Sequence, residues 1–195
     1  MKQFENPPGA TSLDPDELEG LKLKHITTRG ELDRWEQENI GDAMDWLERR
    51  RKGDILTEEF IKTLHDKMLG KIWTWAGTFR KSGKNIGADW RTIGIELRQL
   101  LDDVRFWIEN KTYPEDEIAA RFHHRLVAIH LFPNGNGRHA RLMADVLLSD
   151  VFEKAPFTWG NSNLTAENDV RAKYIAALRA ADGHDYNQLM EFVRS

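Results

Sequence analysis

The sequence predicts an all-α fold in which one short β-hairpin is the only extended element. Three observations support this expectation. Apolar residues recur at helical spacing along most of the chain, polar caps and glycine or proline stops bound these stretches, and a single segment combines β-favouring aromatic residues with turn residues. The 195 residues are 40% apolar and 31% charged, which is enough apolar surface for a packed core and excludes a disordered chain.

The N-terminal part of the chain predicts three helices, over residues 15–20, 28–52 and 57–70. The residues that cap or end them are Asp14 with Pro15, Thr28 with Glu31, Thr57 and Gly70. The second helix ends in the basic run 49–52, where cations meet the negative end of the helix dipole. Residues 72–80 are aromatic and 81–89 are rich in turn residues, so the interval between Trp75 and Trp90 is expected to be a loop or a hairpin.

The C-terminal part predicts five more helices, over residues 93–108, 114–130, 136–147, 165–181 and 185–193. Pro114 followed by three acidic residues marks the start of the second of these, and Gly183 separates the last two. No internal repeat or low-complexity tract interrupts the pattern. The sequence therefore predicts a single helical domain with an N-terminal extension.

Composition excludes several classes of function. The chain has no cysteine, which removes disulfides, thiolate metal sites and thiol nucleophiles. No stretch approaches the roughly 20 apolar residues of a membrane span, and the start lacks the apolar centre of a signal peptide, so a soluble cytoplasmic protein is expected. With a net charge of −4, any anion binding must come from a local basic cluster.

Such a cluster lies in the segment His-Leu-Phe-Pro-Asn-Gly-Asn-Gly-Arg-His-Ala-Arg, residues 130–141. The turn 134–137 leads directly into a helix, whose first backbone N–H groups have no helical partner and lie at the positive end of the dipole. Gly135 and Gly137 allow the backbone to approach an anion closely, because a Cβ would stand in the way. The turn therefore predicts a phosphate site.

Three charged or titratable side chains accompany the turn. Arg138 and Arg141 are three residues apart and share one face of the helix, where two planar guanidinium groups can bind a polyphosphate. His130 lies at the other end of the short turn and is the candidate base for a hydroxyl that attacks the bound phosphate. The alternative is an ordinary helix–loop–helix corner with solvated arginines, and the combination of all these residues favours the phosphate site.

The segment resembles the signature of the Fic family, His-x-Phe-x-(Asp/Glu)-Gly-Asn-Gly-Arg-x-x-Arg. It matches this signature at His130, Phe132, Gly135, Asn136, Gly137, Arg138 and Arg141. Residues 75–80 and 171–178 resemble the family's Trp-Ala-Gly segment and its C-terminal helix. The resemblance predicts a Fic domain over residues 30–195, preceded by an N-terminal arm over 1–29. Within the family the chain resembles the bacterial subgroup called mobile mystery protein B, whose genes tend to accompany a small helix-turn-helix protein, a possible partner.

This resemblance implies the transfer of AMP from ATP, with Mg²⁺, to a Ser, Thr or Tyr hydroxyl of a target protein. His130 would deprotonate the hydroxyl, and Arg141 would bind the γ-phosphate. The residues implied to hold the α- and β-phosphates are Gly135, Asn136, Gly137 and Arg138. A flap made of Lys84, Asn85, Ile86, Gly87 and Ala88 would align the target chain by strand pairing.

One position departs from the family signature. Asn134 stands where the family has the Asp or Glu that binds Mg²⁺, and its neutral amide oxygen is a poorer ligand for a hard cation. Three outcomes are open: weaker nucleotidyl transfer, transfer of a different phosphate-containing group, or nucleotide binding without turnover.

The N-terminal arm contains a candidate autoinhibitory segment. Many Fic proteins carry an inhibitory helix with the pattern (Ser/Thr)-x-x-x-Glu-(Gly/Asn), and Glu19-Gly20 matches its end while Pro15 replaces the hydroxyl residue. The resemblance suggests that Glu19 pairs with Arg141. The alternative is that Glu17 and Glu19 only solvate a short helix.

Three function classes follow from the sequence. The first is a Fic-type adenylyltransferase, and the second is a nucleotide-binding regulator without metal-assisted catalysis. The third, a DNA-binding helical protein, is disfavoured by the net charge of −4 and by the lack of a basic stripe. Neither a membrane nor a nucleic acid is expected as a partner.

Overall fold

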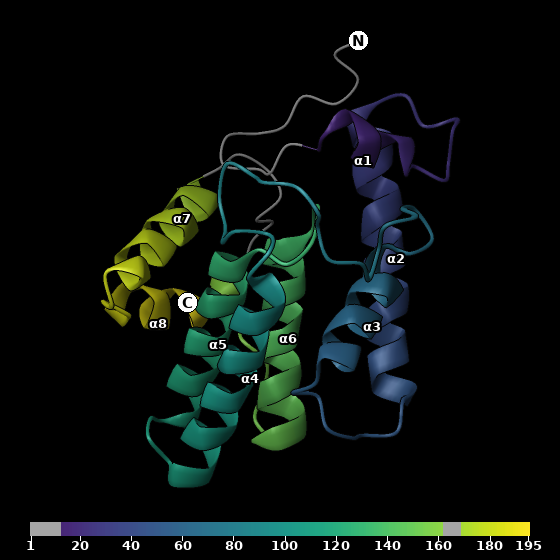
Figure 1. The fold of residues 1–195 in the computed structure, drawn as a ribbon. Coiled ribbons are helices and arrows are strands. Elements are labelled where there is room, and N and C mark those ends of the chain that lie inside the picture. Colours follow the sequence, from purple (N-terminus) through teal and green to yellow (C-terminus); the bar gives the residue numbers. More distant parts are fainter. Residues whose placement is uncertain (1–12, 162–168) are drawn as a thin grey trace.

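The computed structural model describes residues 13–161 and 169–195, and these form a bundle of helices (Figure 1). The helices are α1 Pro15–Glu19, α2 Arg29–Arg49, α3 Glu58–Leu69, α4 Ile93–Asn110, α5 Glu115–Ile129, α6 Asn136–Val151, the 3₁₀ helix η1 Trp159–Asn161, α7 Asp169–Asp182 and α8 Asn187–Val193. The all-α prediction is confirmed. The start of the expected arm, 1–12, and the start of the helix expected over 165–181 lie outside the described residues.

Helix α5 lies at the centre of the bundle and packs against α4, α6 and α8 (Figure 1). Its inward residues Ile118, Ala119, Phe122 and Leu126 are at most 2% exposed. Helices α2 and α3 pack together on one side, with α3 also contacting α6, while α7 and α8 pair on the other. Among the described helices, none has the length and apolar character needed to cross a lipid bilayer.

The helix boundaries follow from local capping chemistry. Thr28 and Glu31 form the expected capping box of α2, in which the Thr28 hydroxyl accepts from the Glu31 N–H at 3.3 Å. The Thr57 hydroxyl accepts from the Phe60 N–H at 3.1 Å at the start of α3. These polar groups satisfy helical donors that would otherwise be unpaired.

The predicted hairpin between Trp75 and Trp90 is wrong: the described residues of this interval form turns and bends and contain no paired strands. Arg80 gives the physical reason. Its guanidinium donates to the carbonyls of Ser82, Ala88 and His130, so the loop's carbonyls are bonded to one buried side chain rather than to an opposing strand. The loop is thereby attached to the end of α5.

The predicted contact between Glu19 and Arg141 is also absent among the described residues, because α1 is held elsewhere. Helix α1 packs on the segment after α3, where the Trp75 indole donates to the Glu17 carbonyl at 2.9 Å and Lys84 forms ion pairs with Asp14 and Glu17. Glu19 lines a separate cavity of about 540 Å³ beside Trp75, and Arg141 does not line that cavity.

Candidate active site

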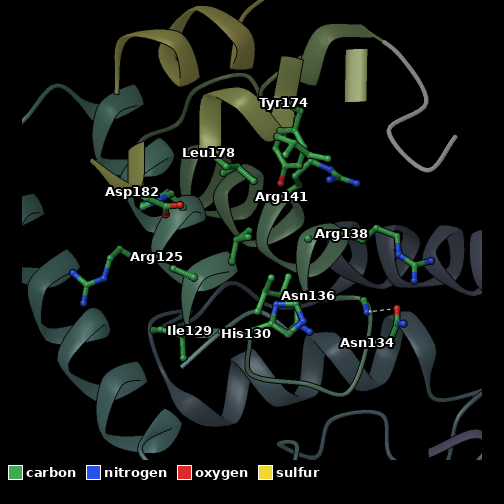
Figure 2. Close-up of a pocket in the computed structure, with 18 of the residues that line it drawn as sticks. Arg125, Ile129, His130, Asn134, Asn136, Arg138, Arg141, Tyr174, Leu178 and Asp182 are labelled. Carbon is green, nitrogen blue, oxygen red and sulfur yellow. Dashed lines mark hydrogen bonds and ion pairs between the residues drawn. The ribbon is translucent and has the colours of Figure 1, made fainter. Parts of the chain in front are cut away.

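A cavity of about 700 Å³ lies between α5, α6, α7 and the loop 86–88 (Figure 2). Six arginines and three carboxylates line it, a formal excess of three positive charges in a chain whose net charge is −4. Figure 2 shows His130 and Arg141 directed into this space. Arg125 and Asp182 lie at the end of the cavity opposite Arg138 (Figure 2). The cavity is therefore the local basic site that anion binding by an acidic protein requires.

The turn 134–137 enters α6 at one wall of the cavity. Gly135 is the N-cap of α6 with φ +78°, and a Cβ there would lie 2.7 Å from Leu69 Cδ1, so the fold itself requires glycine. Gly137 differs, because a Cβ would meet its nearest neighbours, Arg141 Nη1 and the Tyr174 hydroxyl, at 3.8 and 3.9 Å. Packing therefore does not explain Gly137, and the space beside it is open to a ligand.

The Asn136 side chain is occupied within the turn. Its Oδ1 accepts from the Phe132 N–H at 2.8 Å, and its Nδ2 donates to the Phe132 carbonyl at 2.7 Å. The first helical bond of α6 runs from the His139 N–H to the Gly135 carbonyl, 2.9 Å. The donors available to an anion are consequently the backbone N–H groups of residues 136–138.

His130 ends α5 in the left-handed conformation, with φ 59° and ψ 64°, and is 3% exposed. Burial, followed by the charge of Arg80, lowers its pKa to about 4, while a hydrogen bond with the Val127 backbone acts in the opposite direction. Gly87 packs against it so closely that a Cβ at 87 would lie 2.5 Å from His130 Cβ. His130 is therefore neutral at pH 7 and chemically able to accept a proton.

The two motif arginines have different surroundings. Arg138 Nη1 lies 2.7 Å from Glu36 Oε2 of α2, and Glu36 Oε1 accepts from the Trp73 indole at 2.7 Å. Burial raises the pKa of Glu36, but the charge of Arg138 and the bond from Trp73 outweigh burial and lower it, so Glu36 is ionised. Arg141 instead lies over the ring of Tyr174 in α7, with its Cζ 5.6 Å from the ring centroid.

The predicted flap residues divide into two groups. Ile86, Gly87 and Ala88 line the cavity, whereas Lys84 and Asn85 do not. The Lys84 ammonium is turned toward α1, and its side chain is only 3% exposed. The part of this loop that reaches the site is therefore its 86–88 backbone.

Asn134 does not provide the ligand that Mg²⁺ prefers. Its Oδ1 accepts from the Gly135 N–H at 2.6 Å and its backbone carbonyl lies 3.0 Å from His65 Nε2 (Figure 2 marks the first of these contacts). In the part of the chain that the structure describes, no group of three or more His, Asp or Glu side chains is arranged to hold a metal ion. One neutral amide turned onto its own loop is a poor donor set for a hard cation, so the side chain of residue 134 does not fit a magnesium site.

Four residues of the site are not identified by the sequence. Glu36, His65 and Arg80 contact motif residues from distant parts of the chain. Tyr174 packs against Arg141, and its hydroxyl forms a hydrogen bond of 3.0 Å with His123 Nε2. The signal that could have marked Glu36, His65 and Arg80 is a polar residue at a buried position of an apolar pattern, since buried polar groups need partners.

Comparisons with known proteins identify a family and relatives that this chain resembles. The family model for the Fic/DOC family matches residues 55–148. A protein adenylyltransferase Fic from Aedes aegypti is 27% identical over 146 residues, which cover 73% of this chain and 28% of that protein. The chain thus spans about a quarter of the length of this curated relative.

Two solved structures share the fold. Fic-1 of Caenorhabditis elegans, residues 134–508, has a TM-score of 0.62 and 24% identity over 80% of this chain and 46% of that one. The BepC effector protein of Bartonella tribocorum, solved with bound AMPPNP, has a TM-score of 0.70 and 16% identity over 97% of this chain and 93% of that one. The family match and the shared fold lead to one conclusion: residues 55–148 of this chain match the Fic/DOC family, and the chain has the fold of solved Fic proteins.

Proposed function

We propose that this protein transfers AMP from ATP to a hydroxyl group of a target protein. The observation that carries the proposal is the placement of neutral, buried His130 on the same cavity as the 134–137 turn, Arg138 and Arg141. The name of the Aedes aegypti relative, protein adenylyltransferase Fic, supports the same activity. We assign the domain to residues 30–195, because α2 packs on α3 and supplies Glu36 to the site.

The proposed reaction balances with the groups present in this cavity. The target oxygen forms a bond with the α-phosphorus, the bond from that phosphorus to the α,β-bridging oxygen breaks, and pyrophosphate leaves. His130 takes the hydroxyl proton. The backbone N–H groups of residues 136–138 and the two motif arginines stabilise negative charge on the phosphates, in a cavity that the 86–88 loop borders. Mg²⁺ bound to ATP itself would neutralise phosphate charge.

The experiment that tests the proposal measures the intact mass of the protein and of candidate targets after incubation with ATP and Mg²⁺ or Mn²⁺. ATP labelled on the α- or on the γ-phosphate separates the outcomes. Label from the α-phosphate and a mass increase of AMP are expected. Label from the γ-phosphate alone would indicate phosphate transfer, and tight ATP binding without labelling of any protein in a broad lysate would indicate a nucleotide-binding regulator.

Gly137→Ala tests whether the open space beside the turn is used by phosphate. The packing predicts little change in the free energy of unfolding, or a gain of up to about 1 kcal/mol, since alanine is the better helix residue. We expect ATP to bind about tenfold or more weakly, because the methyl group occupies the ligand's space. Isothermal titration with a non-hydrolysable ATP analogue and urea unfolding measure the two effects.

Gly94→Ala is the matched control, because a Cβ at this helical glycine has no neighbour within 4 Å. It should leave ATP binding unchanged. Unchanged ATP affinity in Gly137→Ala would contradict the proposed phosphate position.

Glu36 is the acid that competes with phosphate for Arg138. Its buried negative charge lowers the positive potential of the turn, so Glu36→Gln should tighten ATP binding and raise transfer at low ATP. For two unit charges at an assumed separation of about 7 Å and an effective dielectric constant near 20, the interaction is roughly 2 kcal/mol, which corresponds to tenfold or more in affinity. Titration of the analogue at two salt concentrations measures the change.

Glu38→Gln removes an exposed charge of the same helix and should have almost no effect. Weaker ATP binding in Glu36→Gln would show that the carboxylate orients Arg138 for the ligand instead of competing with it.

The proposed partners follow from the exposed backbone at the site. The 86–88 segment borders His130 and is suited to align a target chain through main-chain hydrogen bonds, which would place its hydroxyl near the histidine. A small helix-turn-helix protein as a second partner and a cytoplasmic location remain predictions from the resemblance of the sequence. Co-purification with the neighbouring gene product tests the first of these.

A further inference from the structure

Helix α3 forms the floor beneath the 134–137 turn. Leu69 and His65, one helical turn apart, are the first two neighbours that a Cβ on Gly135 would meet, at 2.7 Å from Leu69 Cδ1 and 3.4 Å from His65 Nε2. His65 has no exposed surface, and its ring stacks on Phe132 with 3.7 Å between the centroids and 14° between the planes. The imidazole is thus fixed between α3 and the start of the motif.

The partners of the His65 ring determine which of its nitrogens carries the proton. The Gly77 backbone N–H donates to Nδ1 at 3.0 Å, so Nδ1 must be unprotonated. Nε2 lies 3.0 Å from the Asn134 carbonyl, an acceptor, so Nε2 must carry the hydrogen. Burial, followed by the charge of His139, lowers the pKa of His65 well below its usual value, in agreement with this neutral form.

From this geometry we infer that His65 is a positioning residue for the phosphate turn, acting through the Asn134 carbonyl. The Asn134 peptide group immediately precedes Gly135, the N-cap of α6, so its orientation affects where the N–H groups of 136–138 point. The inference rests on the proposed nucleotide site and adds the means by which that site is held. His65 also connects the turn to Gly77, which has a φ of +73° and lies in the loop before the predicted flap.

Two substitutions of His65 each keep one of its two ring hydrogen bonds and remove the other. In His65→Gln the amide N–H₂ occupies the place of Nε2 and retains a donor toward Asn134. In His65→Asn the shorter amide retains an acceptor toward Gly77 and loses that donor. Both variants lose the stack on Phe132 and one of the two ring hydrogen bonds, so both should lose similar stability, and the difference in their ATP affinities shows which of the two bonds supports the turn.

We expect His65→Gln to bind a non-hydrolysable ATP analogue within about threefold of wild type, and His65→Asn to bind it at least about tenfold more weakly, at comparable unfolding midpoints. In transfer assays the loss in His65→Asn should fall mainly on KM. Equal affinities in the two variants, or a loss that follows stability alone, would overturn the inference.

NMR keeps the test independent of ATP binding. Long-range ¹H–¹⁵N correlation of the wild-type ring should show the form protonated at Nε2, and the amide signals of 135–138 should shift in His65→Asn but much less in His65→Gln. A ring protonated at Nδ1 in the wild type would refute the inference even if both variants failed to fold. Unshifted amides in His65→Asn would refute it even if the protein bound no ATP.

Discussion

His130→Ala is expected to lower the rate of AMP transfer by a factor of about 10² to 10⁴ while ATP binding stays close to wild type. Removal of a general base has costs in this range, since the attacking hydroxyl then loses its proton to water. The pKa of about 4 keeps His130 neutral from pH 6 to 8, so the wild-type rate should show no histidine titration in that interval. Single-turnover transfer of label from the α-phosphate measures the rate.

Two further variants make this result specific. His130→Asn suits the left-handed backbone at φ 59° and preserves a polar side chain, yet it cannot act as the base, so it should be equally inactive. His25→Ala removes an exposed histidine that does not line the cavity and should retain full activity. Wild-type transfer by a correctly folded His130→Ala would refute the assigned role.

Acidification from pH 7 to pH 5 is expected to lower the free energy of unfolding by roughly 5 kcal/mol. Burial is the first cause of a lowered pKa in four histidines: the pKa is about 3 for His123, about 4 for His130 and His139, and well below its usual value for His65. In the unfolded chain these groups bind protons near pH 6.5, whereas the folded chain excludes them. Stability is therefore complete above pH 6.5 and is lost as the pH falls toward 4.

Asp145 opposes this trend. Burial raises its pKa to about 6, so the folded protein binds a proton there before the unfolded chain does, and this adds roughly 1 kcal/mol of stability at pH 5. The carboxylates with lowered pKa values, such as Glu36 and Asp116, lose their contribution only below about pH 4.5. The interval from pH 7 to 5 is thus dominated by the histidines.

Urea unfolding followed by tryptophan fluorescence at the two pH values measures the effect. His139→Gln can retain a donor to the Ile61 carbonyl, which lies 3.0 Å from His139 Nε2, but it does not titrate, so the difference between pH 7 and 5 should shrink by about 2 kcal/mol. The exposed His25→Gln should leave the difference unchanged. Equal stability of the wild type at both pH values would show that these histidines are accessible to protons.

Local chemistry made much of the fold predictable. The capping box at Thr28 and Glu31 and the cap at Thr57 depend on neighbours three residues away, so the sequence identifies them directly. The hairpin failed for the opposite reason. Arg80 bonds to the carbonyl of Ile129, 49 residues away, and such a partner leaves no trace in a local pattern of turn residues.

The same distinction separates the two halves of the site. The turn and its arginines are neighbours in sequence, and local helix geometry is sufficient to bring them together. Glu36 and Arg138 are 102 residues apart, and His65 and Asn134 are 69 apart. Each of these pairs forms only because α2 and α3 pack beside the start of α6.

By itself, the sequence determined the helical class, the helix caps and the glycine turn at the start of α6, because each depends on residues within one or two helical turns of one another. Only the tertiary structure decided which acid meets a motif arginine, which histidine supports the turn and where α1 lies. Buried charges and hydrogen-bonding groups must be paired, and which groups pair is decided by the packing of helices that are distant in the chain.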